Sequence, residues 1–262
     1  MTPKAELLTD AVTLYEGDSL EVMRSLPSGS AHSVMTDPPY TAAGGSTNGR
    51  SGGHSADSQF FLYWLRDVVA EITRVVRPDG CGFLFCDWRT VGVMCEAFSP
   101  ARSTSRGTDW KVSQALVWDR ECIGLGSPFR NSFEMLVFVR GPDWKTELPK
   151  NLPTVIRHRY PYGQHVNHGA EKPVELCKQL IRWSCPEAGI VFDPFAGSGT
   201  GGLAAEACGR KAVLIEMESD YCEIIRRRVR EADGAAPGTL FREVARRESL
   251  FADEPEPEVA TK

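Results

Sequence analysis

Hydrophobic positions along the chain follow two alternating patterns. Short runs rich in β-branched and aromatic residues are separated by segments whose apolar residues recur at helical spacing. The short runs predict strands at residues 12–15, 32–37, 81–87, 113–118, 134–139, 189–193 and 211–216. The helical pattern is clearest at residues 59–76, 173–184, 201–208 and 220–232, and a turn signal, Arg-Pro-Asp-Gly, follows the first of these. This alternation predicts an α/β fold, in which helices cover both faces of a mostly parallel sheet.

Two segments interrupt the alternation. Residues 41–58 are rich in Gly and Ser, and residues 140–170 are irregular and rich in Pro and His. Both follow predicted strand ends, where open parallel sheets bind ligands. Loops of this length in a compact domain are usually functional or disordered. We expect one domain over residues 1–240 and an acidic, disordered tail over residues 241–262.

The composition is that of a globular protein with one large core, since 42% of the 262 residues are hydrophobic and 25% are charged. No apolar run approaches the roughly 20 residues that span a bilayer, and the N-terminus has no apolar secretory signal. These features predict a cytoplasmic protein with no membrane partner. The eight cysteines have no CxxC spacing, and several lie in apolar segments, so we expect reduced thiols and no metal site.

The charge balance varies along the chain. The formal net charge of −5 does not favour a nucleic-acid partner. Residues 101–170, however, contain ten Lys and Arg against six Asp and Glu, a local balance of +4. Because the local field governs binding, this segment is compatible with a basic face.

The first motif with clear chemistry is Asp193-Pro194-Phe195-Ala196-Gly197-Ser198-Gly199-Thr200, between a predicted strand and a predicted helix. A Gly-rich turn before a helix N-terminus lets the backbone approach a cofactor closely. Glu216 ends the next strand, where an acid would bind ribose hydroxyls. Gly197, Gly199 and Gly202 also satisfy the GxGxxG pattern of nicotinamide and flavin enzymes, or they could simply form a tight turn.

The second motif is Asp37-Pro38-Pro39-Tyr40, directly after an apolar strand. It could be a simple Asp-Pro turn. It also has the groups needed to activate an exocyclic amino group, whose lone pair is delocalised into the base. The Asp37 carboxylate and the Pro38 carbonyl, whose direction proline restricts, could accept its two N–H groups. Tyr40 could stack on a base turned out of a duplex.

Together, the two motifs resemble those of the amino-group DNA methyltransferases, which make N6-methyladenine and N4-methylcytosine. Residues 16–23 and the segment His168-Gly169-Ala170-Glu171-Lys172-Pro173 are similar to further family segments. The resemblance implies a circularly permuted, seven-stranded, Rossmann-like methyltransferase fold with S-adenosylmethionine as cofactor. It also implies a role for Asp18 at the cofactor's adenine, for Lys172 at its methionine end and for Glu216 at its ribose. Phe195 would pack on the cofactor or belong to the core.

The order of the motifs, with Asp37 before the Gly-rich turn, resembles the family's β group. In that group, target recognition lies between the motifs, here in about residues 89–170, which include the locally basic segment. The shortness of this region indicates a short target in double-stranded DNA and is compatible with a homodimer. Residues 41–58 would close over the flipped base. Gly169-Ala170 departs from the family's Pro-Thr, which removes a hydroxyl expected near the cofactor.

Several alternatives remain beside this interpretation. Asp37 favours adenine, but the cytosine N4 amino group presents a similar edge. An RNA or protein methyltransferase of the same lineage would more often have Asn in place of Asp37. A nicotinamide oxidoreductase would leave Asp37-Pro38-Pro39-Tyr40 without a role, and a non-catalytic DNA-binding module would leave the cofactor motif without one. Cytosine C5 methylation is excluded, because it needs a Pro-Cys nucleophile and the chain has only Cys185-Pro186.

Overall fold

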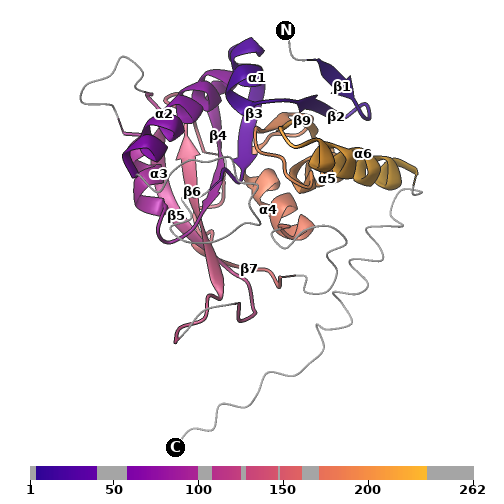
Figure 1. The fold of residues 1–262 in the computed structure, drawn as a ribbon. Coiled ribbons are helices and arrows are strands. Elements are labelled where there is room, and N and C mark those ends of the chain that lie inside the picture. The colour runs from indigo at the N-terminus through magenta and orange to yellow at the C-terminus, as the bar shows by residue number, and fades with distance from the viewer. Residues whose placement is uncertain are drawn as a thin grey trace, which may run out of the picture.

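The computed structural model describes residues 4–39, 58–99, 108–124, 128–146, 148–160 and 171–234. These residues form one nine-stranded sheet with the strand order β1-β2-β9-β8-β3-β4-β6-β5-β7 (Figure 1). Strands β2, β9, β8, β3 and β4 run parallel to one another, whereas β6 runs antiparallel to both β4 and β5. The predicted α/β class with a mostly parallel sheet is therefore confirmed.

All seven predicted strands are present. They are β2 (Val12–Glu16), β3 (Ala31–Thr36), β4 (Val76–Cys86), β5 (Lys111–Asp119), β6 (Phe133–Arg140), β8 (Ile190–Asp193) and β9 (Lys211–Glu216). Two strands that the sequence did not predict extend the sheet at its edges. These are β1 (Ala5–Leu7), antiparallel to β2, and β7 (Val155–Arg157), parallel to β5.

Helices cover both faces of the sheet (Figure 1). Helices α1 (Ser19–Ser25), α2 (Ser58–Val75) and α3 (Val91–Ala97) pack on one face, and α4 (Val174–Ser184), α5 (Thr200–Ala207) and α6 (Ser219–Gly234) pack on the other. Successive strand residues alternate between two buried clusters, because side chains point to opposite faces. On β4, for example, Phe83 and Phe85 join one cluster and Leu84 and Cys86 join the other.

The turn predicted after the first long helix lies within strand β4. Val76 pairs with Ala31 and Cys81 pairs with Ser33, so β3 advances by two residues while β4 advances by five. The extra residues, 77–80, form a bulge in which Arg77 and Asp79 make an exposed ion pair at 2.8 Å. The turn signal was thus correct in marking an irregularity, but the chain stays within the strand.

The interval expected to contain target recognition, residues 89–170, supplies α3, β5, β6 and β7 to the fold. It contributes three of the nine strands, and the connection between β5 and β6 lies at the same end of the sheet as the carboxyl end of β4. Residues 41–57, 161–170 and 235–262 lie outside the described residues, so the expectations for the loop and the tail stay predictions. Among the described helices, none is long and apolar enough to cross a membrane.

Candidate active site

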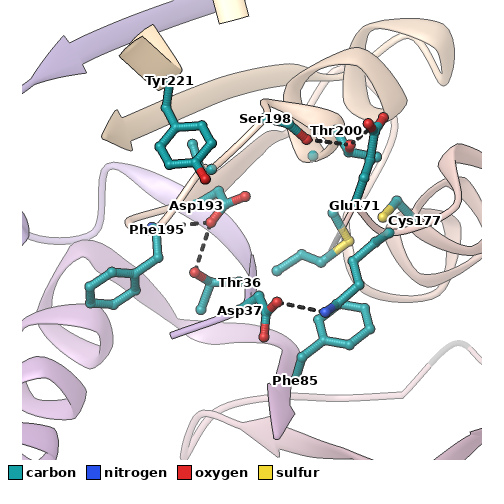
Figure 2. A pocket seen from close by; sticks show the side chains of 15 residues that line it. Thr36, Asp37, Phe85, Glu171, Cys177, Asp193, Phe195, Ser198, Thr200 and Tyr221 are labelled. Carbon is teal, nitrogen blue, oxygen red and sulfur yellow. Dashed lines mark hydrogen bonds and ion pairs between the residues drawn. The ribbon is translucent and has the colours of Figure 1, made fainter. Parts of the chain in front are cut away.

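A pocket of about 210 Å³ opens at the carboxyl ends of β3 and β8, where the two predicted motifs meet (Figure 2). Strands β3 and β8 pair in parallel, which places Asp37 and Asp193 at the same edge of the sheet. The wall of the pocket is formed by Met35, Thr36, Asp37, Phe85, Glu171, Lys172, Cys177, Asp193, Phe195, Ala196, Gly197, Ser198, Thr200, Gly201 and Tyr221. Of the residues predicted to bind a cofactor, six therefore line one cavity together with Asp37: Lys172, Asp193, Phe195, Gly197, Ser198 and Thr200.

The Gly-rich turn forms one side of this pocket. Gly197 and Gly199 have φ angles of 52° and 80°, in the left-handed region where a side chain is disfavoured. Gly199 is the N-cap of α5, and a Cβ there would lie 2.9 Å from Ile225. A Cβ on Gly197, which lines the pocket, would instead meet no atom within 4 Å. The absence of a side chain at Gly199 is therefore needed for the packing of α6, whereas its absence at Gly197 leaves room for a ligand beside the backbone.

Asp193 is buried beneath the turn and forms part of the pocket wall. Its Oδ1 accepts hydrogen bonds from Thr36 Oγ1 at 2.7 Å and from the Phe195 amide at 3.2 Å (Figure 2). Burial raises the pKa of Asp193 to about 7, because desolvation of the carboxylate outweighs these two hydrogen bonds. Asp193 therefore links β3, β8 and the turn.

The raised pKa of Asp193 predicts a pH-dependent stability. An unfolded Asp titrates near pH 3.9, so between about pH 4 and 7 the folded protein binds more protons than the unfolded chain. The stabilisation that comes from the proton on Asp193 is complete below pH 4 and is lost as the pH rises through 7. Asp193→Asn keeps an oxygen for Thr36 and removes the titration. Between pH 5 and pH 8, the free energy of unfolding measured with denaturant should decrease more for the parent protein than for the variant. Equal decreases would contradict the raised pKa of Asp193.

Glu216 lies at the end of β9, next to the turn. Its Oε1 accepts from the amides of Met217 and Glu218 at 2.9 Å each, and its Oε2 accepts from the Gly197 amide at 2.8 Å. Burial raises the pKa of Glu216, and the three amides partly offset this effect. Each carboxylate oxygen has two lone pairs, so Oε2 keeps one acceptor position for a hydroxyl group.

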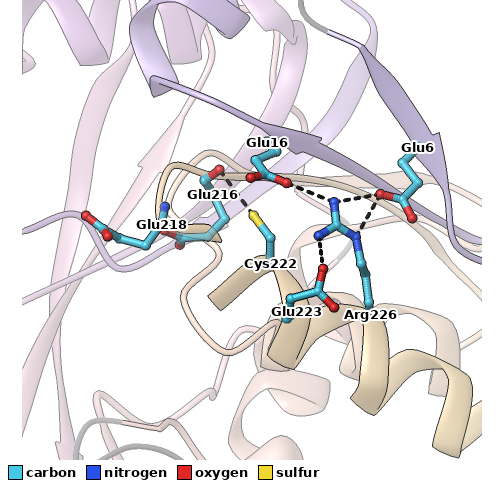
Figure 3. A network of polar contacts seen from close by, with 7 residues as sticks. All are labelled: Glu6, Glu16, Glu216, Glu218, Cys222, Glu223 and Arg226. Atoms are coloured by element: carbon cyan, nitrogen blue, oxygen red, sulfur yellow. Dashed lines mark hydrogen bonds and ion pairs between the residues drawn. The ribbon is translucent and has the colours of Figure 1, made fainter. Parts of the chain in front are cut away.

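An arginine of helix α6 joins strands β1 and β2 beside Glu216. Arg226 of α6 binds Glu6 on β1, Glu16 on β2 and Glu223 of its own helix at 2.7–2.9 Å (Figure 3). Glu16 ends β2 and is paired with Glu216 of β9. The arginine thus fixes edge strand β1 and helix α6 beside the carboxyl ends of β2 and β9.

The Asp37 carboxylate forms an ion pair inside the pocket. Lys172 Nζ lies 2.6 Å from Asp37 Oδ2 and 2.9 Å from Glu134 Oε2. Burial alone would strongly lower the pKa of Lys172, but the charges of Asp37 and Glu134 together raise it, so the ammonium stays charged. Pro38 is buried and Pro39 is exposed, whereas Tyr40 lies outside the described residues.

Two predicted cofactor residues make contacts other than the predicted ones. Lys172 lines the pocket, but its ammonium contacts Asp37, and its predicted role at the methionine end stays a prediction. Asp18 is exposed, caps α1 by accepting from the Glu21 amide at 3.0 Å, and does not line the pocket. Its proximity to Glu216 is nevertheless secure, because the Gly17 amide donates to the Glu216 carbonyl at 2.9 Å.

The sequence did not predict two charged residues that contact the site from β6 and α6. Glu134 on β6 binds Lys172, and Arg228 on α6 reaches the Gly-rich turn. Arg228 donates to the Ser198 carbonyl at 2.7 Å and to Thr200 Oγ1 at 3.2 Å, and it forms an ion pair with Glu171. Neither residue lies in a motif, and only the tertiary fold brings them to the pocket.

Comparisons with known proteins find a family model and relatives that match most of this chain. A family model described as DNA methylase, for N6 and N4 methyltransferases, matches residues 31–227, which span both motifs. The DNA adenine methyltransferase YhdJ of Escherichia coli K12 is 26% identical over 247 residues, which are 84% of this chain and 83% of YhdJ.

Solved structures show the same fold. The cytosine-N4-specific PvuII DNA methyltransferase superimposes with a TM-score of 0.67 at 19% identity, over 91% of this chain and 93% of its own. The complex of M1.HpyAVI with SAM gives a TM-score of 0.63 at 21% identity, over 83% of this chain and 98% of its own. The predicted methyltransferase fold is confirmed, with two edge strands added to the expected seven.

Proposed function

Because the chain belongs to the N6/N4 DNA methylase family, we propose that it methylates the N6 amino group of adenine in double-stranded DNA. Methyl transfer from S-adenosylmethionine to DNA is the reaction of this family. The observation that carries the proposal is the meeting of Asp37 and the Gly-rich turn in one pocket. The cofactor side and the base-activating side thereby face a common space, as a direct transfer requires.

The residues present fit S-adenosylmethionine. The open space beside Gly197 admits a ligand close to the backbone, and Glu216 Oε2 retains an acceptor position for a ribose hydroxyl. We assign Ser198 and Thr200, whose side chains line the pocket, to the methionine end. Phe195 lines the same pocket and packs against Trp64 with ring centroids 5.8 Å apart, so one ring serves both the cofactor pocket and the core. When bound, the cofactor supplies an electrophilic methyl group.

The base-activating groups would act on the amino nitrogen. Asp37 and the Pro38 carbonyl accept its two N–H groups and draw it toward tetrahedral geometry, which frees its lone pair for attack on the methyl carbon. The bound cofactor would supply its methyl group to that lone pair, and the electrons of the methyl–sulfur bond would remain on sulfur. The nitrogen would then lose one proton, which Asp37, as the acceptor of that N–H group, would take up and pass to solvent. Tyr40 is proposed to stack on the flipped base.

Exposed apolar side chains at the same sheet edge favour a nucleic-acid partner. Trp88 follows β4 and is 65% exposed, and Phe129, in the β5–β6 connection, is 91% exposed. Arg89 lies beside the Trp88 ring, 5.9 Å from its centroid. Aromatic and arginine side chains together can stack on bases and neutralise phosphates. We propose that this edge faces the duplex.

Trp88→Ala is expected to weaken binding of duplex DNA by about tenfold, because a stacking contact contributes roughly 1–3 kcal/mol. Fluorescence anisotropy with labelled DNA measures this change, and calorimetry should show unchanged S-adenosylmethionine binding. Leu7→Ala is the matched control, since Leu7 is 67% exposed on β1 at the opposite side of the sheet. Equal effects of the two substitutions on DNA affinity would remove the support for this duplex-facing edge.

Two similar proteins are named for different target bases, so the base that this chain methylates needs a direct test. YhdJ is an adenine methyltransferase by name, whereas the PvuII enzyme of the same fold is cytosine-N4-specific. We favour adenine because the chain has Asp37 before Pro-Pro-Tyr. The test is methyl transfer to unmethylated DNA, followed by digestion and mass spectrometry of the nucleosides. N6-methyldeoxyadenosine is expected, N4-methyldeoxycytidine would correct the base, and no methylated nucleoside would overturn the proposed DNA reaction.

A further inference from the structure

A buried chain of alternating charges leads from the active site to the β5–β6 hairpin. Lys172 lies between the Asp37 and Glu134 carboxylates, and Arg120 NH1 lies 3.8 Å from the other oxygen of Glu134. The guanidinium of Arg120 in turn covers the ring of Tyr160 at 4.1 Å. The side chains of Lys172, Glu134 and Arg120 are only 10%, 17% and 14% exposed.

Burial of these charged side chains costs folding free energy unless each has a partner of opposite charge. Burial of an ion carries a penalty of several kcal/mol, so removal of one partner leaves an uncompensated charge. Two carboxylates and two cations balance here, and the Lys172 ammonium lies 2.6 Å from Asp37 and 2.9 Å from Glu134. With Glu134 neutral, the ammonium would turn fully toward Asp37. Asp37 would then be a weaker and displaced acceptor for an amino group.

We propose that Glu134 is a positioning residue for the methyl-transfer step, which acts by holding Lys172 at a fixed place beside Asp37. The inference rests on the proposed function of Asp37 and deepens it. Lys172 is assigned to the base-activating side of the pocket, since both of its charged partners lie there. Glu134 stands opposite Trp118 in the β5–β6 pairing, so the hairpin proposed to face the duplex would also support Asp37.

The test is a single-turnover methyl-transfer rate with saturating cofactor and DNA. Glu134→Gln keeps the shape of the side chain and is expected to lower this rate by about 10²-fold, as small misplacements of reacting groups do. The dissociation constant of S-adenosylmethionine, measured by calorimetry, should stay within about twofold. Glu175→Gln is the matched control, because Glu175 binds Lys178 at 2.7 Å on α4 and does not line the pocket.

A double-substitution cycle separates positioning from general stability. If Glu134 acts through Lys172, Glu134→Gln should cause no further loss of rate in a Lys172→Met background. Glu134→Asp, which keeps the charge, should retain more activity than Glu134→Gln, and thermal unfolding identifies any variant that fails to fold. A parental rate for a folded Glu134→Gln, or additive losses, would overturn the inference. Full activity of Asp37→Ala would instead overturn the proposed function itself.

Discussion

Asp37→Ala should abolish methyl transfer while S-adenosylmethionine still binds. The substitution removes one of the two proposed acceptors for the amino group, and loss of such a preorganised group costs about 10²–10³-fold or more in rate. The fold should persist, because Lys172 keeps Glu134 as a counter-ion at 2.9 Å and is not left as an isolated buried charge. A radiolabelled methyl-transfer assay, paired with calorimetric titration of the cofactor, measures both properties.

Asp37→Asn is the control for charge. The amide keeps an oxygen that can accept an N–H group, so this variant should retain measurable activity between that of the parent and that of Asp37→Ala. Joint loss of cofactor binding and transfer in Asp37→Ala would indicate that Asp37 supports the pocket as a whole. That outcome would contradict the assigned role at the base.

Strands β3, β8 and β9 could be predicted because they are largely buried on both faces and are therefore mostly apolar. Residues 189–193, for example, contain Ile190, Val191 and Phe192 before the acidic end at Asp193. The edge strands β1 and β7 escaped prediction because each has only three residues, too few for any periodicity. Helix α1 had a local signal that was not used, since Asp18 at its N-cap precedes Glu21 by three positions.

The site was predictable where its residues lie in contiguous motifs. Asp37 and Asp193 each end an apolar strand, and parallel pairing of β3 with β8 brings the two ends together. The partners of Lys172 could not be read in the same way. Glu134 contacts Lys172 only because β6 lies beside β4, an arrangement that depends on the whole sheet order. Arg228 reaches the turn from α6 for the same reason, since packing of helices sets its position.

Gly197→Ala should weaken S-adenosylmethionine binding by about 10- to 100-fold, because a methyl group that intrudes on a fitted site costs roughly 1–3 kcal/mol. Gly197 lines the pocket, and its Cβ would meet no protein atom within 4 Å, so the new methyl group would occupy ligand space. The left-handed φ of 52° adds a cost of about 1–2 kcal/mol in folding free energy. Calorimetry and denaturant unfolding measure the two effects separately.

Gly209→Ala separates the ligand effect from the backbone effect. Gly209 has a φ of 70° and equally open surroundings, but it follows α5 at the end remote from the pocket. Both variants should therefore lose a similar free energy of unfolding, whereas only Gly197→Ala should lose cofactor affinity. If both bound S-adenosylmethionine as the parent protein does, the turn would be a structural feature alone, and the cofactor would have to lie elsewhere along the strand ends. If both lost affinity equally, general destabilisation would be the cause, and the open space at Gly197 would not be the cofactor's place.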